Sequence, residues 1–322
     1  MRLRLLPAIA GLAVLVLVAT TVDRSGDSDG DAPEPAPSAA GAALPPGPVD
    51  TYVALGDSYT AGPLVRWVRR DPPTCLRSTR NYPAVLAQWL DVDQLVDASC
   101  SGADTGDLQA PQSGFGQRVP AQLSGVTAGT DLVTLGIGGN DADLFSALVA
   151  GSRPPRVLST LERVSSRVAR IVAAIQVRAP AATIVVVGYP RIVPPRGTCA
   201  ALPFDAADNR YLDRVERALN AGLRRATRDQ AVYVDTYGPS RGHHVCAAEA
   251  WVNGSSTRAL RALAYHPFAS GMQATARAVH EALRGQPPSI AARRQARRML
   301  APRPADALSR TEQRFTASLL GG

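Results

Sequence analysis

Residues Thr51–Gly62 read TYVALGDSYTAG, and this stretch sets the expectations for the rest of the chain. Its first half, Tyr52–Leu55, is apolar and partly β-branched, which is typical of a buried strand. Gly56-Asp57-Ser58 then ends the strand, so Ser58 falls at the turn into the next element. Open α/β sheets bind ligands at this edge, where a backbone N–H at a helix N-terminus can face negative charge. A serine that only caps a helix has the same local sequence, so a catalytic role needs partners elsewhere in the chain.

Strand and helix patterns alternate along the chain that follows. Further strands are predicted at Gln94–Ala98, Thr130–Ile137, Ala182–Gly188 and Ala231–Asp235. Helices are predicted at Asn81–Leu90, Val157–Arg178, Asp205–Arg228 and Ala269–Arg284. The strand–helix order repeats about five times, which favours a doubly wound sheet. We therefore predict an α/β fold, a three-layer α/β/α sandwich with a central, mostly parallel sheet of about five strands.

The N-terminus predicts export. Arg2 and Arg4 precede an apolar run from Leu5 to Val22, which is the layout of a secretory signal. We expect residues 1–22 to be that signal and the protein to be extracellular. An uncleaved anchor that holds the protein on the outer side of a membrane is the alternative.

Two further segments flank the predicted domain at residues 49–285. Residues 23–48 are rich in Asp, Ser, Gly, Pro and Ala and predict a disordered linker. Residues 286–322 form a basic tail in which Arg293–Leu320 could make one or two helices with thin apolar faces. We expect a solvated or loosely packed tail, with contact to an acidic cell-envelope surface as the weaker alternative.

The charge of the chain is concentrated in this tail. The net charge is +8, and all of the basic residues are arginines. Gly285–Gly322 holds seven arginines against Asp306 and Glu312, a net of +5, so the rest of the chain is only weakly basic. No aromatic residues interleave with the arginines, and nucleic-acid binding is not expected.

Four cysteines, Cys75, Cys100, Cys199 and Cys246, agree with export. An even count in an exported protein predicts two disulfides, for which three pairings exist. We expect the sequence-local pairs, Cys75–Cys100 and Cys199–Cys246, each of which would stabilise the fold by about 3–4 kcal/mol. Zinc is the competing interpretation, but the C-x-x-C spacing that would support it does not occur.

A serine nucleophile needs a base, and the chain has only four histidines. His243 and His244 lie next to each other in a loop, and adjacent histidines rarely face one metal ion. His280 falls inside the last helix, where we expect it on the surface. His266 is followed by Pro267 just before that helix, and it is the candidate base.

Acyl transfer also needs donors that stabilise an oxyanion. Three candidates follow predicted strands: the backbone N–H groups of Ser58 and Gly102 and the side-chain amide of Asn140. Glycine and asparagine are common in turns, so each alone means little. Their occurrence in this order, together with His266, predicts an acyl-transfer site that requires no metal or cofactor.

Four blocks carry a resemblance to a known family. They are Gly56-Asp57-Ser58-Tyr59, Gly102 within CSGADT, Gly138-Gly139-Asn140-Asp141, and His266-Pro267 before a helix that contains Gly271. Over about Val49–Leu283 the chain resembles the SGNH/GDSL hydrolase superfamily, and its secreted actinobacterial esterase and lipase branch. The resemblance implies a Ser58 nucleophile, a His266 base, and an oxyanion hole of Ser58, Gly102 and Asn140.

One position departs from that pattern. Members of the superfamily usually have an aspartate three residues before the histidine, and this chain has Leu263 there. We expect the backbone carbonyl of Leu263, or of a close neighbour, to accept the Nδ1–H of His266, which makes a Ser–His dyad. Asp143 and Asp235 are the carboxylates that could take that place instead. Asp57 is expected to hold the turn.

The predicted function is a secreted serine esterase or lipase that hydrolyses carboxylic esters through an acyl-serine intermediate. We expect a monomer acting on small-molecule or lipid esters. An acyltransferase or a polysaccharide deacetylase could use the same site. A non-catalytic cell-envelope-binding module is the alternative from another class. The loops Pro63–Arg80 and Thr105–Pro120 would determine the acyl preference.

Overall fold

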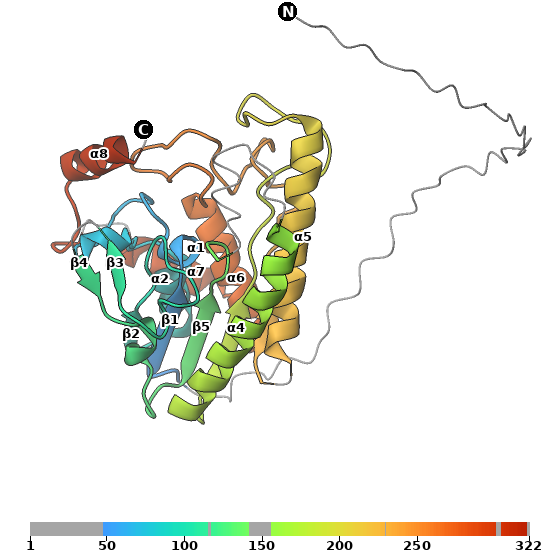
Figure 1. The fold of residues 1–322 in the computed structure, drawn as a ribbon. Helices are drawn as coiled ribbons and strands as arrows, with labels where there is room; N and C mark the ends of the chain where they lie inside the picture. The colour runs from blue at the N-terminus through green and yellow to red at the C-terminus, as the bar shows by residue number, and fades with distance from the viewer. Residues whose placement is uncertain (1–47, 115–116, 142–155, 229, 301–303, 321–322) are drawn as a thin grey trace, which may run out of the picture. The chain divides into compact units, whose positions relative to one another are not determined.

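A five-stranded parallel sheet forms the centre of the structure (Figure 1). The structure is a computed structural model, and it describes residues 48–320 except 115–116, 142–155, 229 and 301–303. The strand order is β2-β1-β5-β6-β7. The bounds are β1 Thr51–Gly56, β2 Gln94–Asp97, β5 Leu132–Gly136, β6 Thr183–Val187 and β7 Val232–Val234. Every neighbouring pair is parallel, which confirms the predicted α/β fold. The chain reverses its direction of winding between β1 and β5, which is where such sheets place their sites.

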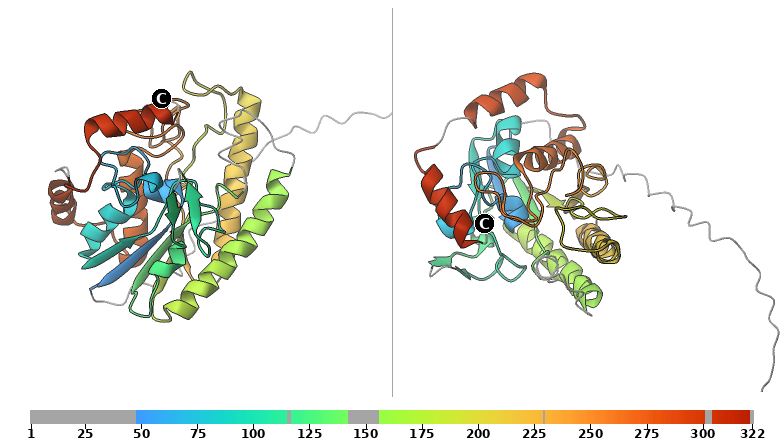
Figure 2. Two further views of the ribbon diagram at one scale, coloured as in Figure 1. Left: turned by 60° about the vertical axis from the view of Figure 1, so that its left-hand side comes forward. Right: turned by 90° about the horizontal axis from the view of Figure 1, so that it is seen from above.

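Helices cover both faces of this sheet (Figure 2). The helices α2 (Tyr82–Leu90) and α6 (Ala269–Arg284) pack on one face, and α7 (Ile290–Met299) packs against α2. The helices α4 (Val157–Arg178) and α5 (Ala206–Thr227) pack on the other. The structure therefore has the predicted three layers.

The apolar run of β1 follows from burial on both faces. Tyr52 and Ala54 face the core beneath α2 and α6, and Val53 and Leu55 face the core beneath α4 and α5. All four side chains are fully buried. A strand covered on both sides has no polar face, so its sequence reads as a continuous apolar run. Each large side chain buried in this way contributes about 1.5–3 kcal/mol to stability.

Some elements differ from the sequence-based expectation. The segment after Gly102 contains a small antiparallel hairpin, β3 (Gln112–Gly114) and β4 (Gln117–Val119). Its sequence is rich in turn residues and does not show a strand pattern. Short 3₁₀ turns occupy Pro73–Cys75 and Gln122–Gly125. His280 is buried rather than on the surface, because its ring packs edge-on against Trp89 of α2.

The C-terminal segment is also not the loosely packed tail expected from its composition. Its last helix, α8 (Arg310–Leu319), packs on the loop that follows Ser58. The N–H of Leu308 donates to the carbonyl of Val68 at 2.8 Å, and the buried amide of Gln313 donates to the carbonyl of Leu64 at 2.8 Å. A thin apolar face is sufficient because hydrogen bonds to loop carbonyls complete the contact.

Several expectations lie outside the described residues. These are the signal at residues 1–22, the linker up to residue 47, and Asp143. In the part of the chain that is described, no helix is both long and apolar enough to cross a membrane.

Candidate active site

Ser58 lies at the N-terminus of a short helix, α1 (Ser58–Ala61), immediately after β1. Asp57 caps this helix, as expected, since its Oδ1 accepts the N–H of Tyr59 at 2.8 Å. Gly56 is required at the turn, because a Cβ there would lie 2.2 Å from Thr60 Oγ1 and 2.4 Å from the carbonyl oxygen of Gly136. The turn therefore places Ser58 at the carboxyl edge of the sheet.

His266 lies directly beside this serine. Its Nε2 is 2.8 Å from the Oγ of Ser58, although 208 residues separate the two in sequence. Its Nδ1 is 2.6 Å from the carbonyl oxygen of Ala264. A carbonyl can only accept, so Nδ1 carries the proton and Nε2 is left to accept the hydroxyl proton of Ser58.

The expected carbonyl was that of Leu263, and the structure corrects this by one residue. The Leu263 carbonyl accepts the backbone N–H of His266 at 3.2 Å and the side-chain amide of Asn253 at 3.1 Å. Tyr265, which lies between the Ala264 carbonyl and His266, has a left-handed φ of 60° that turns the chain back toward that carbonyl. The carbonyl of Ala264, a close neighbour of Leu263, is thereby the one that faces the imidazole.

Two side chains fix the loop that carries His266. The buried Asn253 amide donates to the carbonyls of Ser256, Ala262 and Leu263. The phenol of Tyr59 donates to the carbonyl of Tyr265 at 2.5 Å. The loop is thus tied to the residue that follows Ser58. Sequence reasoning missed Asn253, because an asparagine in a turn carries no signal of this role.

Burial determines the protonation state of His266, the candidate base. It lowers the pKa of His266 to about 4, and the hydrogen bond to the Ala264 carbonyl offsets only part of that shift. The imidazole is therefore neutral at neutral pH, as a base must be. Asp57 shifts in the opposite direction, because burial raises its pKa to about 7 against the hydrogen bonds from Tyr189 and Tyr59.

The acid limb of the pH profile should report this shifted histidine. We expect kcat/KM for a neutral ester to fall below pH 5 with a midpoint of about 4, because only the neutral imidazole accepts a proton. A midpoint near 6.5 would contradict the buried environment. An Asp57→Asn variant is the control: if the pH profile has a second limb near pH 7 and this limb disappears in the variant, that limb belongs to Asp57.

The lowered pKa of His266 also affects stability. The free energy of unfolding should fall as the pH drops from 6.5 toward about 4, because the unfolded chain takes up a proton on this histidine at higher pH than the folded chain does.

The three expected oxyanion donors lie at adjoining turns of the sheet edge. Gly102 adopts a φ of 81°, and the Asn140 amide donates one hydrogen to the carbonyl of Ala103 at 2.7 Å. Among the described residues, the backbone N–H groups of Ser58 and Gly102 have no hydrogen-bond partner. Two backbone N–H groups and the second hydrogen of Asn140 are thus left to donate to an anion.

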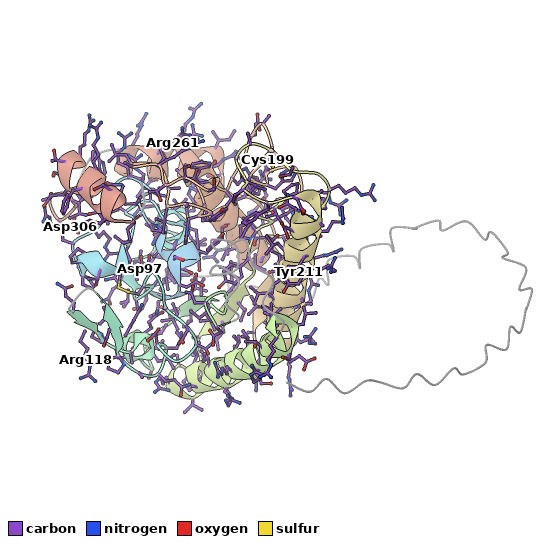
Figure 3. The ribbon with its side chains drawn as sticks, turned by 45° about the horizontal axis from the view of Figure 1, so that its top comes forward. Asp97, Arg118, Cys199, Tyr211, Arg261 and Asp306 are labelled. Atoms are coloured by element: carbon purple, nitrogen blue, oxygen red, sulfur yellow. A yellow bond between two sulfur atoms is a disulfide. The ribbon has the colours of Figure 1, made fainter. Side chains whose placement is uncertain are left out.

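The Asp141 carboxylate fixes the loop that carries Gly102 to the turn that carries Asn140. Asp141 accepts the N–H of Thr105 at 2.8 Å and its hydroxyl at 2.5 Å, and it pairs with Arg167 at 2.9 Å. Asp97, labelled in Figure 3, accepts the N–H and hydroxyl of Ser99 just before the Gly102 loop. Ser99 is only two residues from Asp97, but Thr105 and Arg167 lie 36 and 26 residues from Asp141, too far along the chain to predict.

Both expected disulfides form, Cys75–Cys100 and Cys199–Cys246. The Cys75–Cys100 disulfide holds the loop that carries Gly102, because Cys100 lies two residues before Gly102. The N–H of Cys100 donates to the carbonyl of Gly56 at 2.9 Å, and the N–H of Ser101 donates to that of Cys75 at 3.1 Å.

Removing the first disulfide should cost both stability and activity. We expect the double variant Cys75→Ser/Cys100→Ser to lose about 3 kcal/mol of unfolding free energy. It should also lose kcat, because the Gly102 N–H is then less firmly held. The matched control is Cys199→Ser/Cys246→Ser, which should lose similar stability and keep its kcat. Equal losses of kcat in the two double variants would contradict this role for Cys75–Cys100.

The other candidates have structural contacts. His243 stacks on Trp251 with ring centroids 3.9 Å apart, and its Nδ1 lies 2.7 Å from the carbonyl of Glu249. Asp235 accepts the N–H groups of Tyr237 and Gly238 in the turn after β7.

A serine hydroxyl on a neutral imidazole, beside free N–H donors at a sheet edge, is the arrangement of the α/β serine hydrolases. The comparisons with known proteins agree with this class. Residues 54–274 match the model of the GDSL-like lipase/acylhydrolase family, and the chain therefore belongs to that family and is a carboxylic ester hydrolase.

Three similar proteins come from Streptomyces. Lipase 2 of Streptomyces coelicolor is 35% identical over 223 residues, which are 62% of this chain and 74% of the relative. The crystal structure of the extracellular lipase of Streptomyces rimosus has a TM-score of 0.62 at 28% identity, and the match covers 72% of this chain and 99% of the lipase chain. That of phospholipase A1 from Streptomyces albidoflavus has a TM-score of 0.60 at 26% identity, with the same coverage.

Proposed function

We propose that this protein is a secreted serine esterase or lipase that works with a Ser58–His266 dyad. The observation that carries the proposal is the pair of contacts made by one imidazole, 2.8 Å from the Ser58 hydroxyl and 2.6 Å from the Ala264 carbonyl. This arrangement fixes the tautomer that can accept a proton from serine.

Acylation follows from this geometry. As the Ser58 Oγ attacks the ester carbonyl carbon, its proton passes to His266 Nε2. The carbonyl oxygen becomes an oxyanion that accepts hydrogen bonds from the N–H groups of Ser58 and Gly102 and from the Asn140 amide. Collapse breaks the bond to the alcohol oxygen, which takes the proton from Nε2 and leaves as the free alcohol. The acyl group remains on Ser58.

Deacylation repeats the steps with water. His266 Nε2 takes a proton from water while the oxygen attacks the acyl-Ser58 carbonyl, and the same donors hold the second oxyanion. Collapse releases the carboxylic acid and returns the proton to Ser58. Ala264 supplies a neutral acceptor, which stabilises the imidazolium less than a carboxylate would.

Location and substrate class belong to the same proposal. Two disulfides fit an oxidising, extracellular compartment, and one similar structure is described as an extracellular lipase. We infer that the substrate is an acyl ester of a small alcohol, glycerol or a sugar, and that the enzyme acts as a monomer. Contact of the basic C-terminal segment, residues 286–322, with an acidic cell-envelope surface stays a prediction, and the four arginines of its α7 are exposed.

A fluorophosphonate probe and a panel of p-nitrophenyl esters from acetate to long acyl chains test the proposal together. We expect the probe to label Ser58 and at least one acyl length to be hydrolysed. An unlabelled, inactive protein would favour the non-catalytic envelope-binding module. A new ester that forms faster than free acid when an alcohol is added would favour the acyltransferase. Selective release of acetate from an acetylated polysaccharide would favour the deacetylase.

A further inference from the structure

One buried phenol joins the nucleophile turn to the turn that carries Asn140. Tyr189 follows β6 at the same edge of the sheet and is 2% exposed. Its hydroxyl donates to the Asp57 carboxylate and accepts the N–H of Gly139 at 3.0 Å. A single oxygen thus connects the residue before Ser58 with the residue before Asn140.

Tyr189 is itself held firmly from the helix layer. Asn220 of α5 accepts its backbone N–H at 2.8 Å and donates to its carbonyl at 3.1 Å. Its ring lies edge-on to that of Tyr59, with centroids 5.2 Å apart. Asn220 of α5 therefore fixes the Tyr189 backbone from outside the two turns, and Tyr59 packs against the ring.

The turn that carries Asn140 needs such an external support. It begins with Gly138 and Gly139, and Gly138 adopts a φ of 120° that favours glycine. A Cβ at Gly138 would also lie 2.8 Å from Val164, so a larger residue that would restrict the backbone of this turn does not fit at Gly138. Glycines gain conformational freedom when a contact is lost. Without the phenol, the buried N–H of Gly139 would lose its acceptor as well.

We propose that Tyr189 is a positioning residue for the oxyanion hole, which it sets by fixing the Gly139–Asn140 turn relative to the Ser58 turn. This inference rests on the proposed function, because it concerns the same site. The Asn140 amide must meet the oxyanion within about 2.7–3.1 Å, and a displacement of about 1 Å can cost 10²-fold in rate. Tyr189 acts through Gly139 and touches no substrate.

The first test is Tyr189→Phe, which removes only the hydroxyl. We expect kcat to fall about 10- to 100-fold while KM changes less than about twofold, because the oxyanion forms only in the transition state. The matched control is Tyr52→Phe, which removes a buried phenol hydroxyl that lies 2.7 Å from Thr134 Oγ1 inside the sheet. The control should lower the melting temperature to a similar extent and leave kcat within about twofold.

The second test is a double-mutant cycle with Asn140→Ala, which alone should cost about 10²–10³-fold in kcat. If Tyr189 acts by placing Asn140, then Tyr189→Phe should cost less than about threefold in the Asn140→Ala background. Tyr52→Phe should show the same small effect in both backgrounds. Asn220→Asp, which keeps the acceptor for the Tyr189 N–H and loses the donor to its carbonyl, serves in the cycle if Tyr189→Phe does not fold.

A Tyr189→Phe effect no larger than that of Tyr52→Phe, or one that multiplies in full with Asn140→Ala, would overturn the positioning role. Failure of the proposed function would look different. In that case Ser58→Ala would retain its activity, whatever the cycle shows.

Discussion

Replacing Ser58 with alanine is expected to lower kcat for p-nitrophenyl esters by about 10⁴-fold or more. In the proposed mechanism the Ser58 hydroxyl forms the acyl-enzyme, and the free N–H donors cannot supply a nucleophile. The substitution removes one oxygen at a site that is 4% exposed, so folding should be retained. Initial rates, circular dichroism and fluorophosphonate labelling measure the three consequences.

The matched control for this variant is Ser165→Ala. Ser165 lies on α4, and its hydroxyl donates to the carbonyl of Gly222 on α5 at 2.8 Å. This variant should keep full labelling and activity. Near-normal turnover in Ser58→Ala would mean that the nucleophile lies elsewhere.

Replacing His266 with alanine should cost about 10³-fold or more in kcat, because Ser58 then loses the proposed base. Fluorophosphonate labelling should slow in parallel, since the probe reacts with the same activated hydroxyl. The two measurements together separate loss of the base from loss of ester binding.

His280→Ala is the control for His266→Ala. His280, a residue of α6, is buried to a similar extent, but its ring packs on Trp89 and its Nδ1 lies 3.0 Å from the carbonyl of Gln286. Its replacement should lower stability and leave kcat nearly unchanged. If both variants lost the same activity, the effect would come from destabilisation, and the role of His266 as the base would be wrong.

The sequence predicted the sheet and the main site residues because their signals are local. Runs such as Ala182–Gly188 are apolar since both faces of the strand are covered, and the strand found there is Thr183–Val187. Ser58, Gly102 and Asn140 each follow a strand, and parallel strands bring their carboxyl ends to one edge.

The remaining features depend on contacts between distant segments. Whether Leu263 or Ala264 faces the imidazole is set by the left-handed turn at Tyr265 and by the Asn253 amide. The link between Tyr189 and Asp57 spans 132 residues. Composition suggested a solvated C-terminal tail, since a thin apolar face does not reveal its hydrogen-bonding partners.

The limits of the family match do not coincide with the limits of the folded unit. The match ends at residue 274, yet α8 buries Leu64 near the nucleophile and packs against Leu263 in the histidine loop. A chain shortened after α6 would present these side chains to water and leave the Leu64 carbonyl without the Gln313 amide. Expression of the enzyme should therefore retain the C-terminal segment, and homologues that lack it must stabilise these two loops by other means.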